Sequence, residues 1–500
     1  MISQDNLYIL DMANNHFGDV EHAKRMIDEL AGETRGLEAE IVIKFQLRDL
    51  DSFIHKDFKD RLDLKFVRRF QDTRLEIDEL IELNHYAKTS GFMTMATAFD
   101  EASTETFRTV GYDYAKIASV SSSDFDLVQA IVDLKKPTVA STGGLREKDI
   151  VQLHSILESS GKPFAVMHCV SIYPSPEDSL NLRQIQNLRQ ILPTGSIGWS
   201  THEDPENMIP AVLAKSLGST VFERHVGLQT SDYPLNGYSS SPIQVKKWIM
   251  AVQAAEKMLG SLERPPINPE ERRTLASLNR SYYSRYHLEA GREVSEQDLY
   301  LAFPNDFEDG VEPGKLIPGS ILRADLEPDQ ALRASDLIAP ELSKVGLARD
   351  YALEVQSILR RSKVAYDENS SIVLSHHYGL ERFREFGAAF VTCVNRNYAK
   401  KIIVVLPRQK HPVHFHDMKE ESFQLLWGDA QITIDGKKLN LKVGQLVTVY
   451  PRQWHKFTSL NGCVLEELST HHSGSDSYYE DERIQKLSDE GDSRKTEIKN

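Results

Sequence analysis

The sequence has few cysteines and no long apolar run. Its 500 residues include only three cysteines, Cys169, Cys393 and Cys463, which lie far apart and show no CxxC spacing. This usage argues against a disulfide framework and favours a reducing compartment, so we expect a cytoplasmic protein. No segment approaches the roughly 20 apolar residues of a membrane helix, and the start, MISQDNLYIL, lacks the basic flank and apolar stretch of a secretory signal. We therefore expect no membrane partner.

Basic residues are also in short supply. The sequence has 59 Lys and Arg against 74 Asp and Glu, a formal net charge of -15. A general nucleic-acid-binding protein would need a basic surface, so we expect no nucleic-acid partner. A few local lysines can still hold an anionic substrate inside an acidic protein. The length predicts about three domains, because a single hydrophobic core rarely organises so long a chain.

The first 265 residues alternate short apolar runs with amphipathic segments. The strand candidates are 8–13, 41–45, 92–96, 114–117, 138–141, 164–168, 196–199 and 221–225, and helical periodicity marks 20–30, 125–135, 147–159 and 205–217. Eight β-then-α units over about 250 residues are typical of a TIM (β/α)8 barrel. A doubly wound open sheet is the alternative. The count of eight, and the lack of a GxGxxG after the first strand candidate, favour an α/β fold with a TIM barrel at 1–265.

Polar side chains gather at the ends of these strand candidates. They are Asp11, Asn15 and His16, then Lys44 and Gln46, Thr97 and Asp100, Lys116 and Ser119, residues 141–144, 168–173 and 200–202, and finally Glu223 and His225. In a TIM barrel the carboxyl ends of all strands face one mouth, where the chemistry occurs. A polar residue that caps the end of a strand explains any single position. Capping does not explain why all eight strand candidates end in polar residues.

Lys44 and Lys116 would both point into this mouth. Two nearby ammonium groups repel each other unless an anion lies between them. A phosphate suits them, helped by serine hydroxyls and the backbone amides of 143–144. One alternative is pairing with a carboxylate, and another is a lysine that forms a Schiff base with a carbonyl substrate. The carboxylates available for pairing are Asp11, Asp100 and Glu223.

His202 and His225 come at the ends of neighbouring strand candidates. Two imidazoles with open coordination positions suit a divalent metal that also binds water or a substrate oxygen. Such a metal polarises an aldehyde as a Lewis acid. General acid–base work by the two histidines is the rival interpretation.

Motifs along these 250 residues resemble the sialic acid synthase (N-acetylneuraminate synthase) family. They are Asn15-His16-Phe17-Gly18, Lys44-Phe45-Gln46, Lys116-Ile117-Ala118-Ser119, Ser141-Thr142-Gly143, His168-Cys169-Val170-Ser171-Ile172-Tyr173-Pro174 followed by Asn181-Leu182, Gly198-Trp199-Ser200-Thr201-His202 and Glu223-Arg224-His225. Their order and separations match those of the family. The resemblance implies a phosphoenolpyruvate-dependent synthase that joins this substrate to a sugar aldehyde.

The resemblance implies roles for individual residues. The residues implied to bind phosphoenolpyruvate are Lys44, Gln46, Thr97, Lys116, Ser119, Ser141, Asn181 and Ser200. His202 and His225 match the ligands of a divalent metal, Mn²⁺ or Mg²⁺, and the catalytic candidates are Asp11, Glu223 and Asn236. The implied product is a 3-deoxy-2-ulosonic, sialic-acid-like acid plus phosphate, made in surface carbohydrate biosynthesis.

Three positions depart from the family pattern. Asp11 is one methylene shorter than the usual glutamate, Asn236 replaces a usual aspartate, and the usual Ser-Asp-His is Ser200-Thr201-His202. The phosphoenolpyruvate half of the site therefore looks intact, whereas the half that binds the aldose acceptor looks changed. The sequence indicates the reaction type but does not name the sugar.

Residues 276–338 resemble the small antifreeze-like (SAF) domain, of α+β structure, that follows the barrel in this family. The likeness rests on Asn279-Arg280-Ser281-Tyr282-Tyr283, Phe303-Pro304, Pro313-Gly314 and Asp336-Leu337. In the family this domain is swapped across a homodimer, so the resemblance implies a domain-swapped homodimer. Phe303 stands where the family has an arginine that reaches the acyl group of the acceptor, which argues against an N-acetylmannosamine acceptor. A packing module without ligand contact is the alternative.

Residues 373–480 alternate short strand candidates with turn signals, which predicts an all-β cupin jelly roll. His414 and His416 lie on one face of a strand, and Glu421 and His455 complete a set that suits a second divalent transition metal. The segment also resembles, more loosely, cupin sugar isomerases of the lyxose isomerase type. Alternatives to the synthase are thus a cupin-type sugar isomerase or sugar-binding protein with an inactive barrel, or a Schiff-base aldolase. Residues 481–500 read as a charged tail, frayed or forming a solvated helix.

Overall fold

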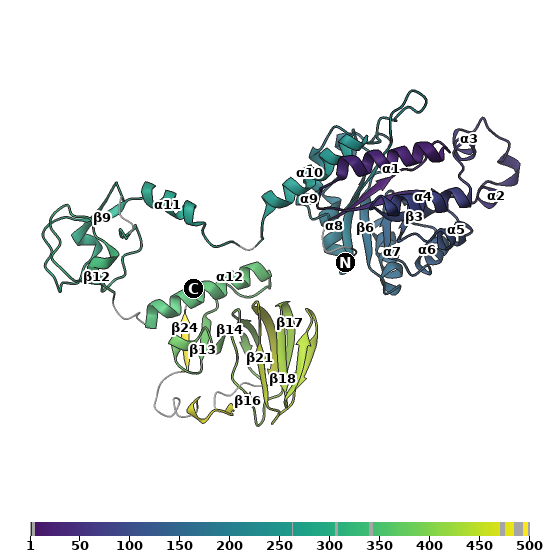
Figure 1. Cartoon of the computed structure of the whole chain (residues 1–500). Helices are drawn as coiled ribbons and strands as arrows, with labels where there is room; N and C mark the ends of the chain where they lie inside the picture. The colour runs from purple at the N-terminus through teal and green to yellow at the C-terminus, as the bar shows by residue number, and fades with distance from the viewer. Residues whose placement is uncertain are drawn as a thin grey trace. The chain divides into compact units, whose positions relative to one another are not determined.

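The structure is a computed structural model that describes residues 2, 6–262, 264–305, 309–339, 344–470, 476–484 and 494–498. The chain divides into two compact units, Met1–Pro265 and Pro266–Asn500. Figure 1 shows the helices and strands of each unit. Among the described helices, none is both long and apolar enough to span a membrane.

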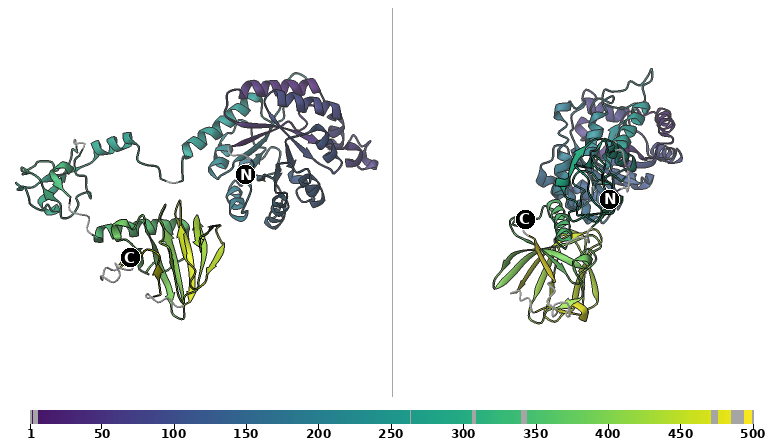
Figure 2. Two further views of the ribbon diagram at one scale, coloured as in Figure 1. Left: turned by 60° about the horizontal axis from the view of Figure 1, so that its bottom comes forward. Right: turned by 90° about the vertical axis from the view of Figure 1, so that its left-hand side faces the viewer.

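The first unit is a closed barrel of eight parallel strands in sequential order. The strands are β1 (Leu7–Asp11), β2 (Glu40–Leu47), β3 (Met93–Ala98), β4 (Tyr114–Ile117), β5 (Thr138–Ser141), β6 (Phe164–Cys169), β7 (Ser196–Thr201) and β8 (Val221–His225). Strand β1 pairs with both β2 and β8, which closes the barrel. In the left view of Figure 2 the helices surround the strands. The predicted TIM barrel is confirmed.

Helices cover the barrel from outside. They are α1 (Val20–Thr34), α4 (Ile77–Thr89), α5 (Ser103–Val110), α6 (Phe125–Val132), α7 (Glu147–Ser159), α8 (Gln184–Ile191), α9 (Ile209–Ser216) and α10 (Pro242–Leu259), with the short α2 (Leu50–Phe53) and α3 (Lys65–Asp72) between β2 and α4. Local chemistry sets their starts. The Asp19 side chain accepts the His22 amide at the start of α1, and Ser241 and Gln244 form a capping box at α10.

Apolar side chains fill the end of the barrel opposite the mouth. Leu7, Ile9, Val42, Met95 and Val139 are among the ten residues of this cluster, and all five are fully buried. A second, larger cluster packs the helices against the outside of the strands. The barrel is therefore a packed core that is open to a ligand at one end only.

The second unit begins with α11 (Pro269–Leu278) and two small two-stranded sheets. The strands are β9 (Ser281–Ser284) with β10 (Leu299–Ala302), and β11 (Ile321–Leu322) with β12 (Leu337–Ile338). Tyr282, Leu288, Leu326 and Leu332 belong to its small core. This is the segment that resembles the antifreeze-like domain.

The rest of the second unit is a helix followed by two antiparallel sheets, as predicted for a cupin. After α12 (Lys344–Ser362), the seven-stranded sheet has the order β20-β17-β22-β15-β14-β13-β24 and the five-stranded sheet β19-β18-β21-β16-β23. The bounds are β13 (Ile372–His376), β14 (Gly387–Asn395), β15 (Tyr398–Val405), β16 (His414–Phe415), β17 (Glu421–Gly428), β18 (Ala430–Ile434), β19 (Lys437–Leu441), β20 (Leu446–Val449), β21 (His455–Thr458), β22 (Cys463–Thr470), β23 (Tyr478–Tyr479) and β24 (Lys495–Ile498).

The end of the chain differs from the expectation of a frayed or solvated tail. Strand β24 pairs in antiparallel register with β13, and Ile498 lies opposite Ile372 at the edge of the larger sheet. Backbone pairing holds this largely polar strand in place, and Ile498 also packs against the hydrophobic core of the cupin part. Part of the predicted tail, 485–493 and 499–500, lies outside the described residues.

Candidate functional site

Period-two alternation along the barrel strands places the predicted polar residues in one mouth. Six apolar residues of the barrel floor are each followed two positions later by a polar residue that lines the cavity nearer the mouth. Ile9 precedes Asp11, Val42 precedes Lys44, and Val221 precedes Glu223. The same step leads from Met95 to Thr97, from Tyr114 to Lys116 and from Val139 to Ser141.

These side chains line one cavity of about 520 Å³. The predicted residues that line it are Asp11, Lys44, Gln46, Thr97, Lys116, Ser119, Ser141, Ser200, His202, Glu223, His225 and Asn236. Asn181 is the exception among the barrel predictions. It lines a different hollow beside α8 and α9, and its side chain donates to the carbonyl of Ser179 at 2.9 Å. Its role in phosphoenolpyruvate binding stays a prediction.

Two lysines and two carboxylates form a buried ionic cluster at the bottom of the cavity. Lys44 Nζ contacts Glu223 Oε1 and lies 2.9 Å from Asp11 Oδ2. Lys116 Nζ lies 3.5 Å from Glu223 Oε2 and donates to Ser141 Oγ at 2.6 Å. All four charged residues are at most 4% exposed. Glu223 thus occupies the position between the lysines, as in the alternative of carboxylate pairing, whereas Asp100 caps the Ser103 amide.

Burial and pairing pull the pKa values of this cluster in opposite directions. Burial alone would raise the pKa of Glu223, but Lys116 and Lys44 lower it to about 2. Burial lowers the pKa of Lys116 despite the attraction of Glu223, whereas Asp11 and Glu223 together outweigh burial and raise that of Lys44. The two lysines therefore differ: Lys44 is firmly charged, and Lys116 is the easier one to deprotonate.

Hydroxyl groups and one glycine form the wall beside Lys116. Thr97 Oγ1 is buried and has no hydrogen-bond partner, as expected of a group that awaits a ligand. The Gly143 amide donates to Ser119 Oγ at 3.0 Å. A Cβ at position 143 would lie 2.8 Å from Ser119 Oγ and 2.7 Å from Ser171 Oγ, so a larger residue would have to displace these hydroxyls. Donors of this kind suit a phosphate.

The two barrel histidines face each other across the mouth. The ring centroids of His202 and His225 are 5.2 Å apart, and the ring of Tyr173 packs 4.2 Å from that of His202. Burial lowers the pKa of His202 to about 3 and also lowers that of His225. His202 Nδ1 lies 3.1 Å from the carbonyl of Val170, which can only accept, so its Nε2 is left as the acceptor atom. Two neutral imidazoles fit a divalent cation with open positions.

Two of the departures from the family pattern, Asp11 and Asn236, lie on the β1 and β8 side of the cavity, whereas Thr201 ends β7 and does not line the cavity. Gln46 Nε2 donates to Asp11 Oδ2 at 3.2 Å, and His225 Nε2 lies 3.6 Å from the same oxygen. Asn236 donates to Asn15 Oδ1 at 3.3 Å. On this side the carboxylates are Asp11 and Glu223, and Gln46 and Asn236 supply side-chain amides.

Three cationic residues of the cavity were not among the predicted site residues. Arg48 follows β2, and Lys65 and Arg69 lie on α3. Lys65 and Arg69 could not be predicted, because α3 belongs to a long connection between β2 and α4 that lacks the barrel's periodicity. Tyr173 was predicted at the end of the sixth strand candidate, but its packing on His202 was not expected.

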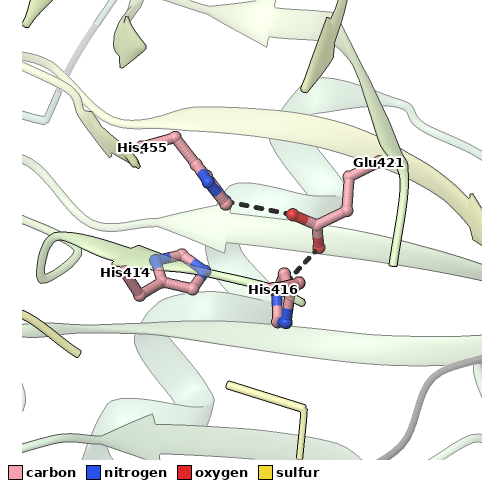
Figure 3. Close-up of side chains that lie close together, drawn as sticks. All are labelled: His414, His416, Glu421 and His455. Atoms are coloured by element: carbon pink, nitrogen blue, oxygen red, sulfur yellow. Dashed lines mark ion pairs between the residues drawn. The ribbon is translucent and has the colours of Figure 1, made fainter. Parts of the chain in front are cut away.

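In the cupin part, the four predicted ligands meet. The ligand atoms of His414, His416, Glu421 and His455 all lie within 4.8 Å of one another, and all four residues are buried. Figure 3 shows Glu421 between His416 and His455, with His414 facing them. His455 Nε2 and Glu421 Oε2 are 3.0 Å apart, yet neither forms a hydrogen bond, as expected of atoms that share a cation. In the described part of the chain this is the one cluster of at least three such ligands.

Backbone carbonyls fix the orientation of the three cupin imidazoles. Nδ1 of His414 lies 3.2 Å from the Pro412 carbonyl and Nδ1 of His455 lies 3.0 Å from that of Gln453. Nδ1 of His416 contacts the carbonyl of Asp476. Because a carbonyl can only accept, each Nδ1 carries the proton and each Nε2 is free to bind metal. The residues fit a divalent transition metal.

Buried charges that were not predicted surround this cluster. Lys419 contacts Glu421 and lies 2.7 Å from Glu467 Oε1, and Lys401 lies 3.2 Å from the same oxygen. Tyr479 and Arg494 line the same cavity. The pattern of a single strand gives little sign of such a network, because its members come from β15, β22 and β23 and from positions outside the strands.

Comparison with known proteins places the chain in a family. The NeuB family model matches residues 35–264. The solved structure of a Chromobacterium violaceum protein assigned to spore coat polysaccharide biosynthesis (protein E) is 38% identical, with a TM-score of 0.64 over 67% of this chain and 99% of its own. The chain belongs to the NeuB family. The resemblance seen in the barrel motifs is confirmed.

Two NeuB-like relatives have names that state an activity. N,N'-diacetyllegionaminic acid synthase of Legionella pneumophila is 27% identical over 64% of this chain and 90% of its own length. N-acetylneuraminate-9-phosphate synthase of Drosophila melanogaster is 27% identical over 59% of this chain and 87% of its own. A cupin domain model matches residues 401–463, which confirms the predicted cupin of this NeuB-family chain.

Proposed function

We propose that the protein condenses phosphoenolpyruvate with a sugar aldehyde to give a 3-deoxy-2-ulosonic acid and phosphate, in surface carbohydrate biosynthesis. The observation that carries this proposal is the meeting of two lysines, several hydroxyls and two neutral imidazoles in one barrel cavity. NeuB membership supports it, because relatives of the chain are named as synthases of legionaminic acid and of N-acetylneuraminate 9-phosphate.

Phosphoenolpyruvate is bound by the cationic and hydroxyl groups on the β4 and β5 side. Lys116, with Ser119 and Ser141, supplies charge-assisted hydrogen bonds to the phosphate, and the unpaired Thr97 hydroxyl adds a further donor. Lys44 lies across from Lys116 and balances the substrate carboxylate. Gln46 and Ser200 complete the proposed set at the cavity wall.

The two barrel imidazoles are the proposed metal ligands. A bound Mn²⁺ or Mg²⁺ would act as a Lewis acid toward the aldehyde oxygen. His202 and His225 stay neutral through burial, so both can offer a lone pair near neutral pH. Packing of Tyr173 holds the ring of His202 in place.

The bond changes are then one addition and one elimination. Carbon 3 of phosphoenolpyruvate attacks the aldehyde carbon, water adds at carbon 2, and the bond from carbon 2 to the phosphate oxygen breaks. Asp11 and Glu223 are the proposed catalytic carboxylates. Asp11 is the one assigned to the acceptor, because it contacts Gln46 and the proposed metal ligand His225. Asn236 orients the acceptor and cannot accept a proton.

The test is the release of inorganic phosphate. Release should require phosphoenolpyruvate, an aldose and a divalent metal together, and the change His202→Ala should abolish it. Phosphate release that continues without an aldose, or none with any aldose, contradicts the proposal. The cupin variant His414→Ala should keep the activity; if it alone loses turnover, the cupin is the working site and the barrel is inactive.

A Schiff-base aldolase is the second candidate, favoured by one observation. Burial lowers the pKa of Lys116 below that of an ordinary lysine, as needed for a nucleophilic amine. Borohydride reduction in the presence of pyruvate would then attach a three-carbon group to Lys116. Absence of this adduct together with aldose-dependent phosphate release favours the synthase.

The cupin part is proposed to hold a second divalent transition metal. Support comes from the buried set of three imidazoles and one carboxylate. Binding of a sugar, or its isomerisation, is the accompanying hypothesis, since the lining also offers Lys401, Lys419, Glu467 and Tyr479. Metal analysis of the purified protein, with His414→Ala as the control, tests the metal.

We further propose a domain-swapped homodimer in a reducing compartment, the cytoplasm. Apolar side chains on the connection after β2 support the dimer, because Phe58 and Phe66 are 46% and 62% exposed in the single chain. The three free thiols of Cys169, Cys393 and Cys463 support the compartment. Sedimentation equilibrium should give twice the mass of one chain; a single-chain mass at micromolar concentration contradicts the dimer.

A further inference from the structure

A second group of polar side chains lies in the cupin cavity, beside the four proposed metal ligands. His377, Tyr479 and Arg494 line this cavity, and we call these three residues the Arg494 subsite. His377 directly follows β13, Tyr479 ends β23, and Arg494 directly precedes β24. The unexpected strand at the end of the chain therefore has a consequence for the cavity, because its pairing with β13 brings Arg494 there.

The Arg494 subsite and the metal ligands are close neighbours. The ring of Tyr479 stacks 5.6 Å from that of His414, and the guanidinium carbon of Arg494 lies 5.1 Å from the centroid of Tyr479. The ring of His411 lies 4.6 Å from that of His414 and 4.8 Å from that of His377. The cavity has a volume of only about 100 Å³. A small ligand that reaches the metal ligands therefore also reaches the subsite.

Two buried nitrogen atoms of the subsite lack a hydrogen-bond partner among the described residues. His377 is 1% exposed, and its Nε2 lies 3.2 Å from the Tyr479 hydroxyl, but its Nδ1 has no partner. Nη1 of Arg494 is also buried and unpaired. Leaving such atoms unpaired costs free energy, so they are normally satisfied by water or by a ligand. Both atoms thus indicate a ligand in this part of the cavity.

The charges of the cavity favour an anionic ligand. Its charged lining residues are Lys401, Lys419, Arg494, Lys495, Glu421 and Glu467. Glu467 lies 2.7 Å from Lys419 Nζ and 3.2 Å from Lys401 Nζ, and Glu421 contacts Lys419. In the part of the chain that the structure describes, no carboxylate forms an ion pair with Arg494. A divalent metal at the four ligands would add to the positive charge.

We propose that the cupin cavity binds a sugar acid, whose carboxylate is bound by Arg494 and His377 while another of its oxygens lies at the metal. This inference rests on the proposed cupin metal and narrows the proposed sugar ligand to an acid. The planar fork of an arginine matches the two oxygens of a carboxylate. The 2-keto acid proposed as the product of the barrel carries such a group, so the product of one unit has the chemistry required by the other.

The test measures binding at the cupin metal in the full chain. The change His202→Ala removes a proposed ligand of the barrel metal, so Co²⁺ added to this variant should bind in the cupin at one ion per chain. The visible absorption of Co²⁺ then reports a change of its ligands. The probes are 2-ketogluconate, glucose 6-phosphate and glucose, which share a six-carbon chain. We expect 2-ketogluconate to bind with a Kd at least tenfold below those of the other two.

Arg494→Gln in the same background gives the second readout, with Arg483→Gln as the matched control. Arg483 is exposed, pairs with Asp481 at 2.7 Å and does not line the cavity. Arg494→Gln should raise the Kd for 2-ketogluconate roughly ten- to a hundredfold, as expected for a lost hydrogen bond to a charged group, and leave the Co²⁺ content unchanged. Arg494→Lys keeps the charge and should recover part of this affinity. Arg483→Gln should change neither quantity.

The outcomes separate the inference from the proposed metal. Equal binding of 2-ketogluconate and glucose, no spectral change with any probe, or unchanged affinity in Arg494→Gln overturns the inference and leaves the metal standing. Tightest binding of glucose 6-phosphate would assign the subsite to a phosphate and overturn the carboxylate. Loss of Co²⁺ in Arg494→Gln would make Arg494 a support of the metal site instead. Failure of the His202→Ala protein to bind Co²⁺ contradicts the cupin metal itself, and the inference falls with it.

Discussion

Replacing Glu223 by glutamine should destabilise the barrel and, at the same time, make it respond more strongly to phosphoenolpyruvate. Glu223 contacts Lys44 and lies 3.5 Å from Lys116 Nζ. After the change Lys44 keeps Asp11 at 2.9 Å, but Lys116 keeps only the neutral Ser141 hydroxyl and the Ile117 carbonyl. Removing one partner of a buried pair costs about 3 kcal/mol, which lowers the midpoint of thermal unfolding by about 6–12 °C for a domain of this size.

Phosphoenolpyruvate should restore much of this loss, because its anionic groups replace the missing carboxylate between the lysines. Scanning calorimetry of the full chain, with and without phosphoenolpyruvate, measures the increase in midpoint for each protein. The increase should be larger in Glu223→Gln than in the wild type. Ligand stabilisation follows the ratio of concentration to Kd, so tighter binding by the variant gives the larger increase.

Glu203→Gln is the control for this experiment. Glu203 is equally buried, lies 3.4 Å from Arg224 and does not line the cavity. Burial raises the pKa of Glu203 to about 7, so this change should cost less stability than Glu223→Gln, and the variant should gain no more from phosphoenolpyruvate than the wild type does. If Glu223→Gln responds to phosphoenolpyruvate no better than Glu203→Gln, the lysines do not bind this anion and the reasoning is refuted.

Three other predictions concern the wall, the second metal and pH. Gly143→Ala places a Cβ 2.8 Å from Ser119 Oγ. Displacing this one charge-assisted hydrogen bond should raise the KM for phosphoenolpyruvate about tenfold. Gly32→Ala adds a Cβ in open space and should leave that KM unchanged, and an equal rise in both variants would refute the role of the Ser119 hydroxyl. Elemental analysis should find one metal fewer per chain in His414→Ala, and unchanged metal content would remove His414 from the ligand set. Burial lowers the pKa of His16 to about 4. As the pH falls below about 6.5, the unfolded chain therefore binds a proton at His16 before the folded chain does. The contribution of His16 to the free energy of unfolding is complete above about pH 6.5 and should fall by about 3 kcal/mol toward pH 4. His16→Gln should flatten that decline in calorimetry, and an unchanged slope would contradict the assignment.

The strand ends could be predicted from the sequence because two regularities coincide there. Alternation fixes which residues point inward, and a barrel brings all carboxyl ends to one mouth, so Lys44, Lys116, His202 and His225 meet without any knowledge of loops. The four cupin ligands followed from the same reasoning on β16, together with spacing. Fold class and most of the candidate site were therefore accessible from local patterns.

What could not be predicted depends on irregular connections and on pairing between distant segments. Arg69 reaches the cavity from α3, whose position follows from the path of a long connection rather than from any period. Asn181 lies after β6 in a similar connection and lines another hollow. Strand β24 is polar, and only its pairing with β13, more than a hundred residues earlier, makes it a strand.

The most direct test of the condensation follows the oxygen atom that bridges carbon 2 and phosphorus in phosphoenolpyruvate. With ¹⁸O at this position, an aldose acceptor and Mn²⁺, the label should leave in inorganic phosphate, because the bond that breaks joins carbon 2 to that oxygen. The three-carbon unit should appear in a new 2-keto acid in equal amount. Label retained in pyruvate, with phosphate formed whether or not an aldose is present, would mean simple hydrolysis and would contradict the account.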